Sequence, residues 1–154
     1  MATKDFNPLR AAAVCGVVVA MASLGGAIAP PGAWYAGLTQ PAGTPPDIAF
    51  PIAWTTLYIF MAIAAWRVWR ARGVGSALGL FALQLILNAC WMPVAFGLQW
   101  LGGALIVIGL LWLAVAATMT AFWRVDRLAG LLFVPYLAWV SYACYLNAGL
   151  AWLN

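Results

Sequence analysis

Three side chains on one predicted helix are the first candidates for chemistry. Gln84, Asn88 and Trp91 are spaced i, i+4, i+7, so they lie on one stripe of a helix. Because an amide that faces lipid is costly, the stripe is expected to face other protein segments. Two interpretations stay open: an interhelical hydrogen bond that holds helices together, or a polar anchor in a ligand pocket.

Tryptophan is unusually frequent, with ten residues in a chain of 154. Six of them lie at predicted helix ends or in loops, where an aromatic belt at the membrane surface explains them: Trp34, Trp66, Trp69, Trp100, Trp123 and Trp152. The other four do not suit a belt so readily, and two tyrosines accompany them: Trp54, Trp91, Trp112 and Trp139, with Tyr58 and Tyr136. Helix packing alone accounts for each ring separately. Converging from different helices, the rings would form an aromatic-walled pocket that opens outward.

The residue types exclude several kinds of chemistry. Histidine is absent, which excludes histidine metal ligation, histidine-based catalytic triads and histidine proton relays. Cys15, Cys90 and Cys144 lie in predicted helices without the spacing of metal ligands, so we expect small buried side chains, no metal site and no cofactor. No charged side chain lies in the interior of a predicted span. Ion-coupled transporters normally keep one there, so active transport and ion conduction are disfavoured.

The composition requires a membrane to accommodate these residues. The chain is 67% hydrophobic and 6% charged, whereas soluble domains carry about 25% charged residues. The uncharged runs between the charges are long enough for five spans of roughly 20 residues. We therefore predict an all-α membrane protein, a five-transmembrane-helix bundle that forms one domain over residues 1–154. The predicted helices cover residues 10–28, 50–69, 76–95, 103–123 and 128–151.

The distribution of charge predicts the orientation of the bundle. With five spans, all seven Lys and Arg residues lie on one side, and the other side has only Asp47. In a bacterial cell membrane the positive-inside rule then puts the N-terminus in the cytoplasm and the C-terminus outside. The first span ends in Ala27-x-Ala29 before a proline, a poor cleavage signal, so we expect a membrane span rather than a cleaved signal peptide. The net charge of +4 is a topology signal, and nucleic acid is not an expected partner.

Prolines mark one long loop and one kink. Five of the nine prolines lie between residues 30 and 49, so this stretch is not a span. It also contains Trp34 and Tyr35, and we expect it to cap the outer mouth of the bundle. Pro135 lies inside the fifth predicted helix, where it would free the carbonyl of Leu131 and so indicates a cavity beside that helix.

A series of short motifs resembles the TspO/MBR family, also called tryptophan-rich sensory proteins, translocator proteins or peripheral-type benzodiazepine receptors. Each motif is weak alone, but their order, spacing and five-span context are specific. The motifs are Trp34-Tyr35, Pro41 and Pro45-Pro46 in the loop; Phe50-Pro51-x-x-Trp54-Thr55-x-Leu57-Tyr58; Gln84-Leu85-x-Leu87-Asn88-x-x-Trp91-x-Pro93-x-x-Phe96-Gly97; and Pro135-Tyr136-Leu137-x-Trp139 with Leu146-Asn147.

The resemblance implies a commonly dimeric bundle that binds porphyrins, and in some members cholesterol or benzodiazepine-type ligands, in a pocket capped by the first loop. The implied ligand-binding residues are Trp34, Tyr35, Trp54, Tyr58, Asn88, Trp91, Trp139 and Ala143. Some bacterial members degrade protoporphyrin in light, for which the matching residues are Trp54 and Trp139. In a eukaryote the resemblance would imply the mitochondrial outer membrane instead of a bacterial cell membrane.

The loop departs from the family pattern in charge and aromatic content. The family usually has Trp near positions 43 and 48 and basic residues near 40 and 47. This chain has Gly43, Ile48, Gln40 and Asp47 there, so porphyrin propionates would meet no cation on the outer side. The sterol-recognition pattern of mammalian members also fails, because no Lys or Arg follows Tyr145.

Three functions remain open at this point. The first is a ligand-binding or sensory membrane protein with a porphyrin-like or sterol-like ligand; the second is a light- and oxygen-dependent porphyrin-degrading enzyme; the third is a facilitated tetrapyrrole transporter. Haem iron needs an axial ligand, so metal-free protoporphyrin is expected to bind at least as well as haem. A homodimer through the third helix is expected from Gly75-x-x-x-Gly79, which permits close backbone approach.

Overall fold

The computed structural model describes residues 9, 12–14, 16–18, 20 and 32–154, and all their regular elements are helices. Four helical segments are long and apolar enough to cross a membrane. Together with a short loop helix, the elements are α2 (Ala33–Ala36), α3 (Ala49–Arg72), α4 (Ser76–Met92) continued by a π-helix η1 (Pro93–Gly97), α5 (Leu101–Val125), α6 (Arg127–Leu131) and α7 (Val134–Leu153). A helical segment able to cross a membrane lies at each of the four predicted spans from residue 50 onward, and each is a few residues longer than predicted.

The first predicted span, residues 10–28, lies largely outside the described residues, and so does Cys15. The described residues between 9 and 20 are helical, and Val14 and Val18 are buried in the core. Their i, i+4 spacing gives this segment one face toward the bundle. The count of five spans stays a prediction.

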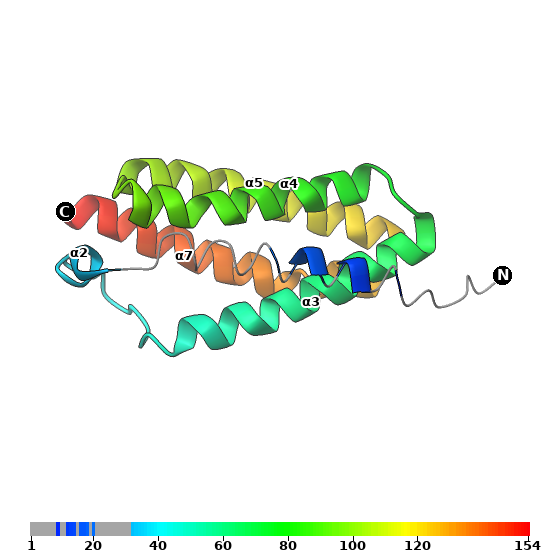
Figure 1. The fold of residues 1–154 in the computed structure, drawn as a ribbon, viewed down its shortest axis with the longest axis horizontal. Coiled ribbons are helices and arrows are strands. Elements are labelled where there is room, and N and C mark those ends of the chain that lie inside the picture. Colours follow the sequence, from blue (N-terminus) through cyan, green and yellow to red (C-terminus); the bar gives the residue numbers. More distant parts are fainter. Residues whose placement is uncertain (1–8, 10–11, 15, 19, 21–31) are drawn as a thin grey trace.

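The spans form an antiparallel bundle (Figure 1). α5 packs along both α4 and α7, while α3 contacts α4, α5 and α6. The Arg72 end of α3 reaches α6, but its Ala49 end lies apart from α7 in Figure 1. Large side chains must therefore bridge α3 and α7 at that end.

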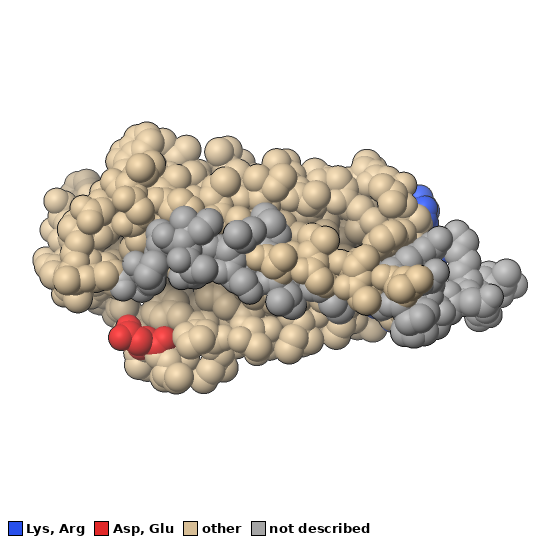
Figure 2. All heavy atoms as spheres, in the orientation of Figure 1, with Lys and Arg blue, Asp and Glu red and all other residues tan. Residues whose placement is uncertain are grey.

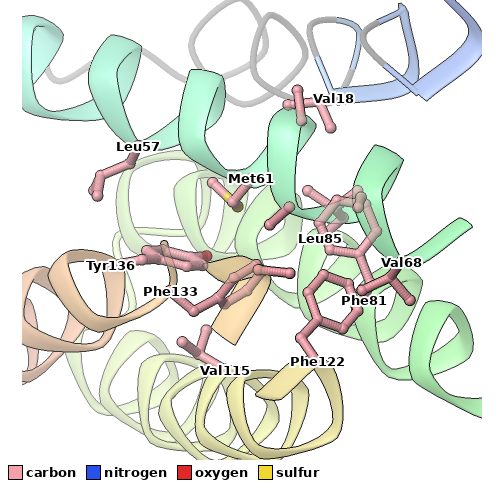
Figure 3. Close-up of a cluster of buried hydrophobic side chains, with 14 of the residues drawn as sticks. Val18, Leu57, Met61, Val68, Phe81, Leu85, Val115, Phe122, Phe133 and Tyr136 are labelled. Atoms are coloured by element: carbon pink, nitrogen blue, oxygen red, sulfur yellow. The ribbon is translucent and has the colours of Figure 1, made fainter. Parts of the chain in front are cut away.

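The middle of the bundle is filled by aromatic rings. Phe81, Phe122, Phe133 and Tyr136 are buried, and consecutive ring centroids lie 5.1 to 6.3 Å apart (Figure 3). The outward surface is apolar as well: large aliphatic side chains such as Leu83, Ile106 and Leu113 are exposed. A bundle that is apolar on both sides suits a lipid environment, in which packing and interhelical hydrogen bonds hold helices together.

The fifth predicted span is broken where one continuous helix was expected. α6 ends at Leu131 and α7 begins at Val134, so Pro135 lies in the first turn of α7. A proline loses no intrahelical hydrogen bond at that position. Pro135 therefore does not interrupt a helix interior as expected, and the cavity beside this helix stays a prediction.

The five described arginines lie at one end of the bundle, as predicted. Arg70 and Arg72 are in the last turn of α3, and Arg124 is in the last turn of α5. Figure 2 shows basic atoms at this end of the molecule and acidic atoms at the opposite end, where α3 begins. The structure therefore carries the charge asymmetry from which the orientation was predicted.

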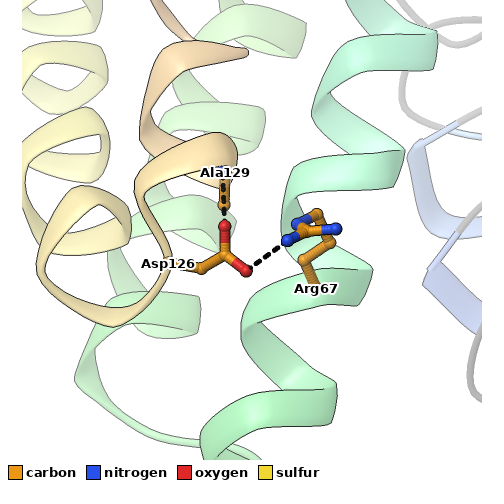
Figure 4. Close-up of polar contacts among 3 residues, drawn as sticks. All are labelled: Arg67, Asp126 and Ala129. Carbon is orange, nitrogen blue, oxygen red and sulfur yellow. Dashed lines mark hydrogen bonds and ion pairs between the residues drawn. The ribbon is translucent and has the colours of Figure 1, made fainter.

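An ion pair closes the basic end (Figure 4). Arg67 Nη2 lies 2.7 Å from Asp126 Oδ2, and Asp126 Oδ1 accepts the backbone N–H of Ala129 and so caps α6. Partial burial opposes ionisation of Asp126, but the hydrogen bond from Arg67, the α6 backbone N–H groups and the guanidinium charge outweigh it and lower the pKa of that carboxyl. The pair ties α3 to the turn between α5 and α6.

The long loop is attached to the last turns of α7. Thr39 and Asn154 exchange two hydrogen bonds, of 2.9 and 3.2 Å. The hydroxyl of Tyr145 donates to the Ala42 carbonyl at 2.9 Å, and that of Tyr142 donates to the Gly43 carbonyl. These contacts hold residues 39–43 against one face of α7.

Candidate functional site

A chain of hydrogen bonds joins three helices beside the aromatic core. The Tyr58 hydroxyl of α3 donates to Asn88 Oδ1 of α4 at 2.8 Å, and Asn88 Nδ2 donates to the Tyr136 hydroxyl of α7 at 3.2 Å. Tyr136 in turn donates to Gln84 Oε1 at 3.0 Å. Gln84 Nε2 lies 3.7 Å from the sulfur of Met61. We call Tyr58, Asn88, Tyr136 and Gln84 the polar chain.

Three of the four residues of the polar chain are buried, including both amides of the stripe on α4. Gln84 and Tyr136 are 0% exposed and Asn88 is 8% exposed. The interhelical hydrogen bonds that were one of the two interpretations are therefore present. A carboxamide can make four hydrogen bonds, and the polar chain uses two of those of Asn88. Asn88 keeps one N–H and one oxygen lone pair for a further partner.

Aromatic rings from α3 and α7 bridge the separation between these helices. Trp54 stacks on Tyr58 with 5.5 Å between centroids and meets the edge of Tyr136 at 6.1 Å. One turn earlier on α3, Phe50 meets Trp139 of α7 at 6.0 Å. Trp54 and Trp139 are both half-buried. The indoles of Trp54 and Trp139 thus present flat π surfaces from two helices next to the polar chain. We call these two indoles the indole wall.

A second polar link joins α4 to α7 nearer the long loop. Trp91 Nε1 donates to Asn147 Oδ1 at 3.3 Å, and Asn147 Nδ2 donates to the carbonyl of Ala143 at 3.0 Å. Asn147 is 5% exposed, and Ala143 is half-buried. Ala143 lies one turn beyond Trp139 on α7, so its small side chain belongs to the same wall.

The loop helix α2 reaches this region through Phe96. The ring of Tyr35 meets Phe96 edge-on at 5.1 Å, and Phe96 meets Trp91 at 5.5 Å. Trp34 lies beside Tyr35 on α2 and is half-buried. Burial and, secondly, the nearby Asp47 carboxylate raise the pKa of the Tyr35 phenol above its ordinary value.

The predicted site residues therefore come together at one end of the bundle. Tyr58 and Asn88 are in direct contact; Trp54 joins them through Tyr58, and Trp91 and Ala143 meet through Asn147. Trp112, which was expected to converge with the other three rings, does not. Its indole N–H donates to Ser141, which is exposed and two residues from Trp139, hence on the opposite side of α7.

Four neighbours of the site were not among the predicted site residues. Phe50 and Phe96 contact Trp139 and Trp91, Tyr142 contacts Trp139, and Asn147 binds Trp91. Phe96 is five residues from Trp91, a spacing that shares a face only when a helix widens to i, i+5. The bond from Leu98 N to the Pro93 carbonyl, at 2.8 Å, shows that η1 does widen here.

These residues can bind a ligand through hydrogen bonds and through contact with aromatic rings. The residues that the structure describes hold no group of three His, Cys, Asp or Glu side chains suited to a metal ion. The polar chain supplies neutral amides and phenols, and the wall supplies indoles. This arrangement suits an apolar, flat molecule with a small number of polar atoms.

Comparison with known proteins identifies the family to which the chain belongs. Residues 12–153 match the TspO/MBR family. The chain is 47% identical over 149 residues to "Protein CrtK" of Rhodobacter capsulatus, a match that covers 92% of this chain and 91% of the relative. It is 48% identical over 122 residues to the "Tryptophan-rich sensory protein" of Cereibacter sphaeroides, covering 79% and 77% of the two chains. It is 40% identical over 119 residues to the human "Translocator protein", covering 74% and 70%. The chain is thus a multi-pass membrane protein that belongs to the TspO/MBR family of tryptophan-rich sensory and translocator proteins.

Proposed function

We propose that the protein binds a flat, apolar, porphyrin-like or sterol-like ligand between the outer halves of α3, α4 and α7. The observation that carries the proposal is the pairing of the polar chain with the indole wall. Trp54 of α3 and Trp139 of α7 each contact a ring of the facing helix, so side chains rather than backbone fill the separation between these helices. Side chains rearrange to admit a ligand at lower cost than helices do.

Each residue of the site has a definite part in this proposal. The rings of Trp54, Trp91 and Trp139 stack on the ligand, with about 0.5–1.5 kcal/mol for each favourable ring pair. Asn88 presents its spare N–H or lone pair to a ring nitrogen or hydroxyl of the ligand. Ala143 leaves room in the wall. Trp34 and Tyr35 close the site from the loop, which the hydrogen bonds to α7 hold in place.

A titration with metal-free protoporphyrin, followed by quenching of tryptophan fluorescence, tests the proposal on the purified full chain. Trp54→Phe and Trp139→Phe are each expected to weaken binding about three- to tenfold, which corresponds to about 0.7–1.4 kcal/mol. Trp152→Phe is the matched control, because Trp152 is 89% exposed at the end of α7. If the three variants bind protoporphyrin equally, the ligand lies elsewhere.

The orientation and the first predicted span complete the proposal. Residues 10–28 cross the membrane first, the N-terminus and the arginine-rich end face the cytoplasm, and the site opens on the other side. Reporter fusions at Gly73 and Asn154 test this arrangement. The Gly73 fusion is expected to report the cytoplasm and the Asn154 fusion the outside; the reverse result would overturn it.

Photo-oxidative degradation of the bound porphyrin is the second candidate, because two indoles from opposite helices flank the proposed ligand. The excited porphyrin is the sensitiser, the indole of Trp139 is an electron donor to it, and oxygen is the oxidant that adds to the porphyrin ring, which is thereby oxidised and lost. Porphyrin loss is then expected to require both light and oxygen. Trp139→Phe is expected to slow that loss much more than it weakens binding. Equal bleaching in the Trp54→Phe, Trp139→Phe double variant would leave a binding protein and no enzyme.

A further inference from the structure

The stretches of sequence at the end of the bundle where the proposed site opens contain almost no charged residues. The sequence has no Lys or Arg between residues 11 and 66, between 73 and 123, or after residue 127. These stretches include the whole long loop and the turn between η1 and α5. The single charged side chain in them is Asp47. None of the described residues at this end of the bundle, which we call the mouth of the site, therefore carries a positive charge.

Asp47 lies close to the mouth itself. Its backbone carbonyl accepts the N–H of Phe50 at 3.3 Å, which places it less than one helical turn from the ring that contacts Trp139. Burial and, secondly, the Asp47 carboxylate raise the pKa of the Tyr35 phenol in the loop helix α2, so these two side chains lie near each other. Asp47 is exposed, and Figure 2 shows acidic atoms at the end where α3 begins.

An anionic ligand would lose hydration at this mouth and gain no compensating ion pair. A carboxylate at the edge of an apolar site needs a cation or several N–H donors to offset that loss. The carboxylate of Asp47 adds repulsion, which is stronger beside a low-dielectric interior than in bulk water. A neutral or cationic ligand of the same shape meets neither cost.

We infer that Asp47 makes the site selective for neutral or cationic flat ligands over dicarboxylic ones of the same ring system. This inference rests on the proposed function and names the class of ligand for the same site. A porphyrin whose propionates are esterified is the simplest molecule that meets the requirement. The free diacid differs from it only in the groups that the mouth disfavours.

The test compares protoporphyrin dimethyl ester with protoporphyrin free acid on the purified full chain in neutral detergent. The ratio of the two dissociation constants is measured in the native protein, in Asp47→Asn and in Asp47→Lys. Comparing one ratio across variants cancels the unequal partition of the two probes into micelles. Asp5→Lys is the matched control, because it makes the same change in net charge before the first predicted span.

The native protein is expected to prefer the ester. Asp47→Lys is expected to strengthen binding of the free acid about tenfold and to leave the ester within about twofold. Asp47→Asn is expected to give an intermediate ratio, and raised salt is expected to reduce the differences. Asp5→Lys is expected to leave the ratio unchanged.

Two results overturn the inference and differ from failure of the proposed function. The inference is wrong if the native protein binds the free acid more tightly and Asp47→Lys leaves the ratio unchanged. It is also wrong if Asp5→Lys shifts the ratio as much as Asp47→Lys, since net charge would then act instead of the mouth. If neither probe binds to any variant, the proposed function itself fails.

Discussion

Replacing Tyr136 with phenylalanine isolates the contribution of the polar chain, because it removes one oxygen atom and keeps the ring. The hydroxyl of Tyr136 donates to Gln84 and accepts from Asn88. Its ring contacts Trp54 at 6.1 Å and Phe133 at 5.9 Å between centroids, and both contacts are retained in the variant. Any loss of stability therefore reports on the two hydrogen bonds.

The expected loss can be worked out from those bonds. An intramolecular hydrogen bond contributes about 0.5–1.5 kcal/mol net, and interhelical bonds in membrane proteins contribute about 0.6–2 kcal/mol. Tyr136 is 0% exposed and so is Gln84, so water does not replace the lost partner. Two such bonds predict that Tyr136→Phe lowers the free energy of unfolding by about 2 kcal/mol.

Tyr58→Phe provides the matched comparison. Tyr58 is half-buried and makes one bond of the polar chain, to Asn88, so about 1 kcal/mol is expected. Equilibrium unfolding in mixed micelles measures both variants and the double variant. The double variant is expected to deviate from additivity, because both hydroxyls act on the same carboxamide. Equal losses for Tyr136→Phe and Tyr58→Phe, with full additivity, would refute the described hydrogen bonds.

Three further predictions concern the wall, the basic end and the dimer. Ala143→Leu is expected to weaken protoporphyrin binding several-fold with the melting temperature nearly unchanged, since the added bulk enters the ligand space; a large loss of stability with unchanged affinity would make Ala143 a packing residue. The folded protein holds the pKa of Asp126 below its ordinary value, so the ionised form stabilises the fold fully above about pH 4 and this stabilisation is lost as the pH falls through the lower, folded pKa. Acid unfolding curves are expected to flatten in Asp126→Asn, and an unchanged acid slope would exclude the Arg67 pair as the cause. Gly79→Leu is expected to convert a dimer to monomers in mild detergent, because a Cβ at Gly75 or Gly79 meets no atom within 4 Å in the monomer and the face is free for close approach; a dimer that persists would exclude this face.

The spans and the buried stripe were predictable because they depend on strong local signals. The charges Arg72, Arg124 and Asp126 bound long apolar runs, and helices must fill those runs in a membrane. Gln84 and Asn88 faced inward because an amide in lipid has no partner. These predictions need no knowledge of which helix lies opposite.

The finer geometry depended on features that helical periodicity does not contain. The break between α6 and α7 moved Pro135 from a helix interior to a first turn. The π-helix brought Phe96 onto the face of Trp91, and the rotation of α5 against α7 turned Trp112 toward Ser141. The partners of each ring follow from the rotation of one helix against another, which a single sequence with 3.6-residue spacing does not specify.

Photo-oxidation footprinting shows directly whether a flat ligand lies between Trp54 and Trp139. Bound protoporphyrin, illuminated briefly in oxygenated buffer at low occupancy, oxidises the nearest indoles, and mass spectrometry of the peptides identifies them. Trp54 and Trp139 are expected to be oxidised first, although they are half-buried and Trp123 and Trp152 are 43% and 89% exposed. Oxidation that follows exposure, with Trp152 and Trp123 ahead of Trp54 and Trp139, would contradict the proposed site.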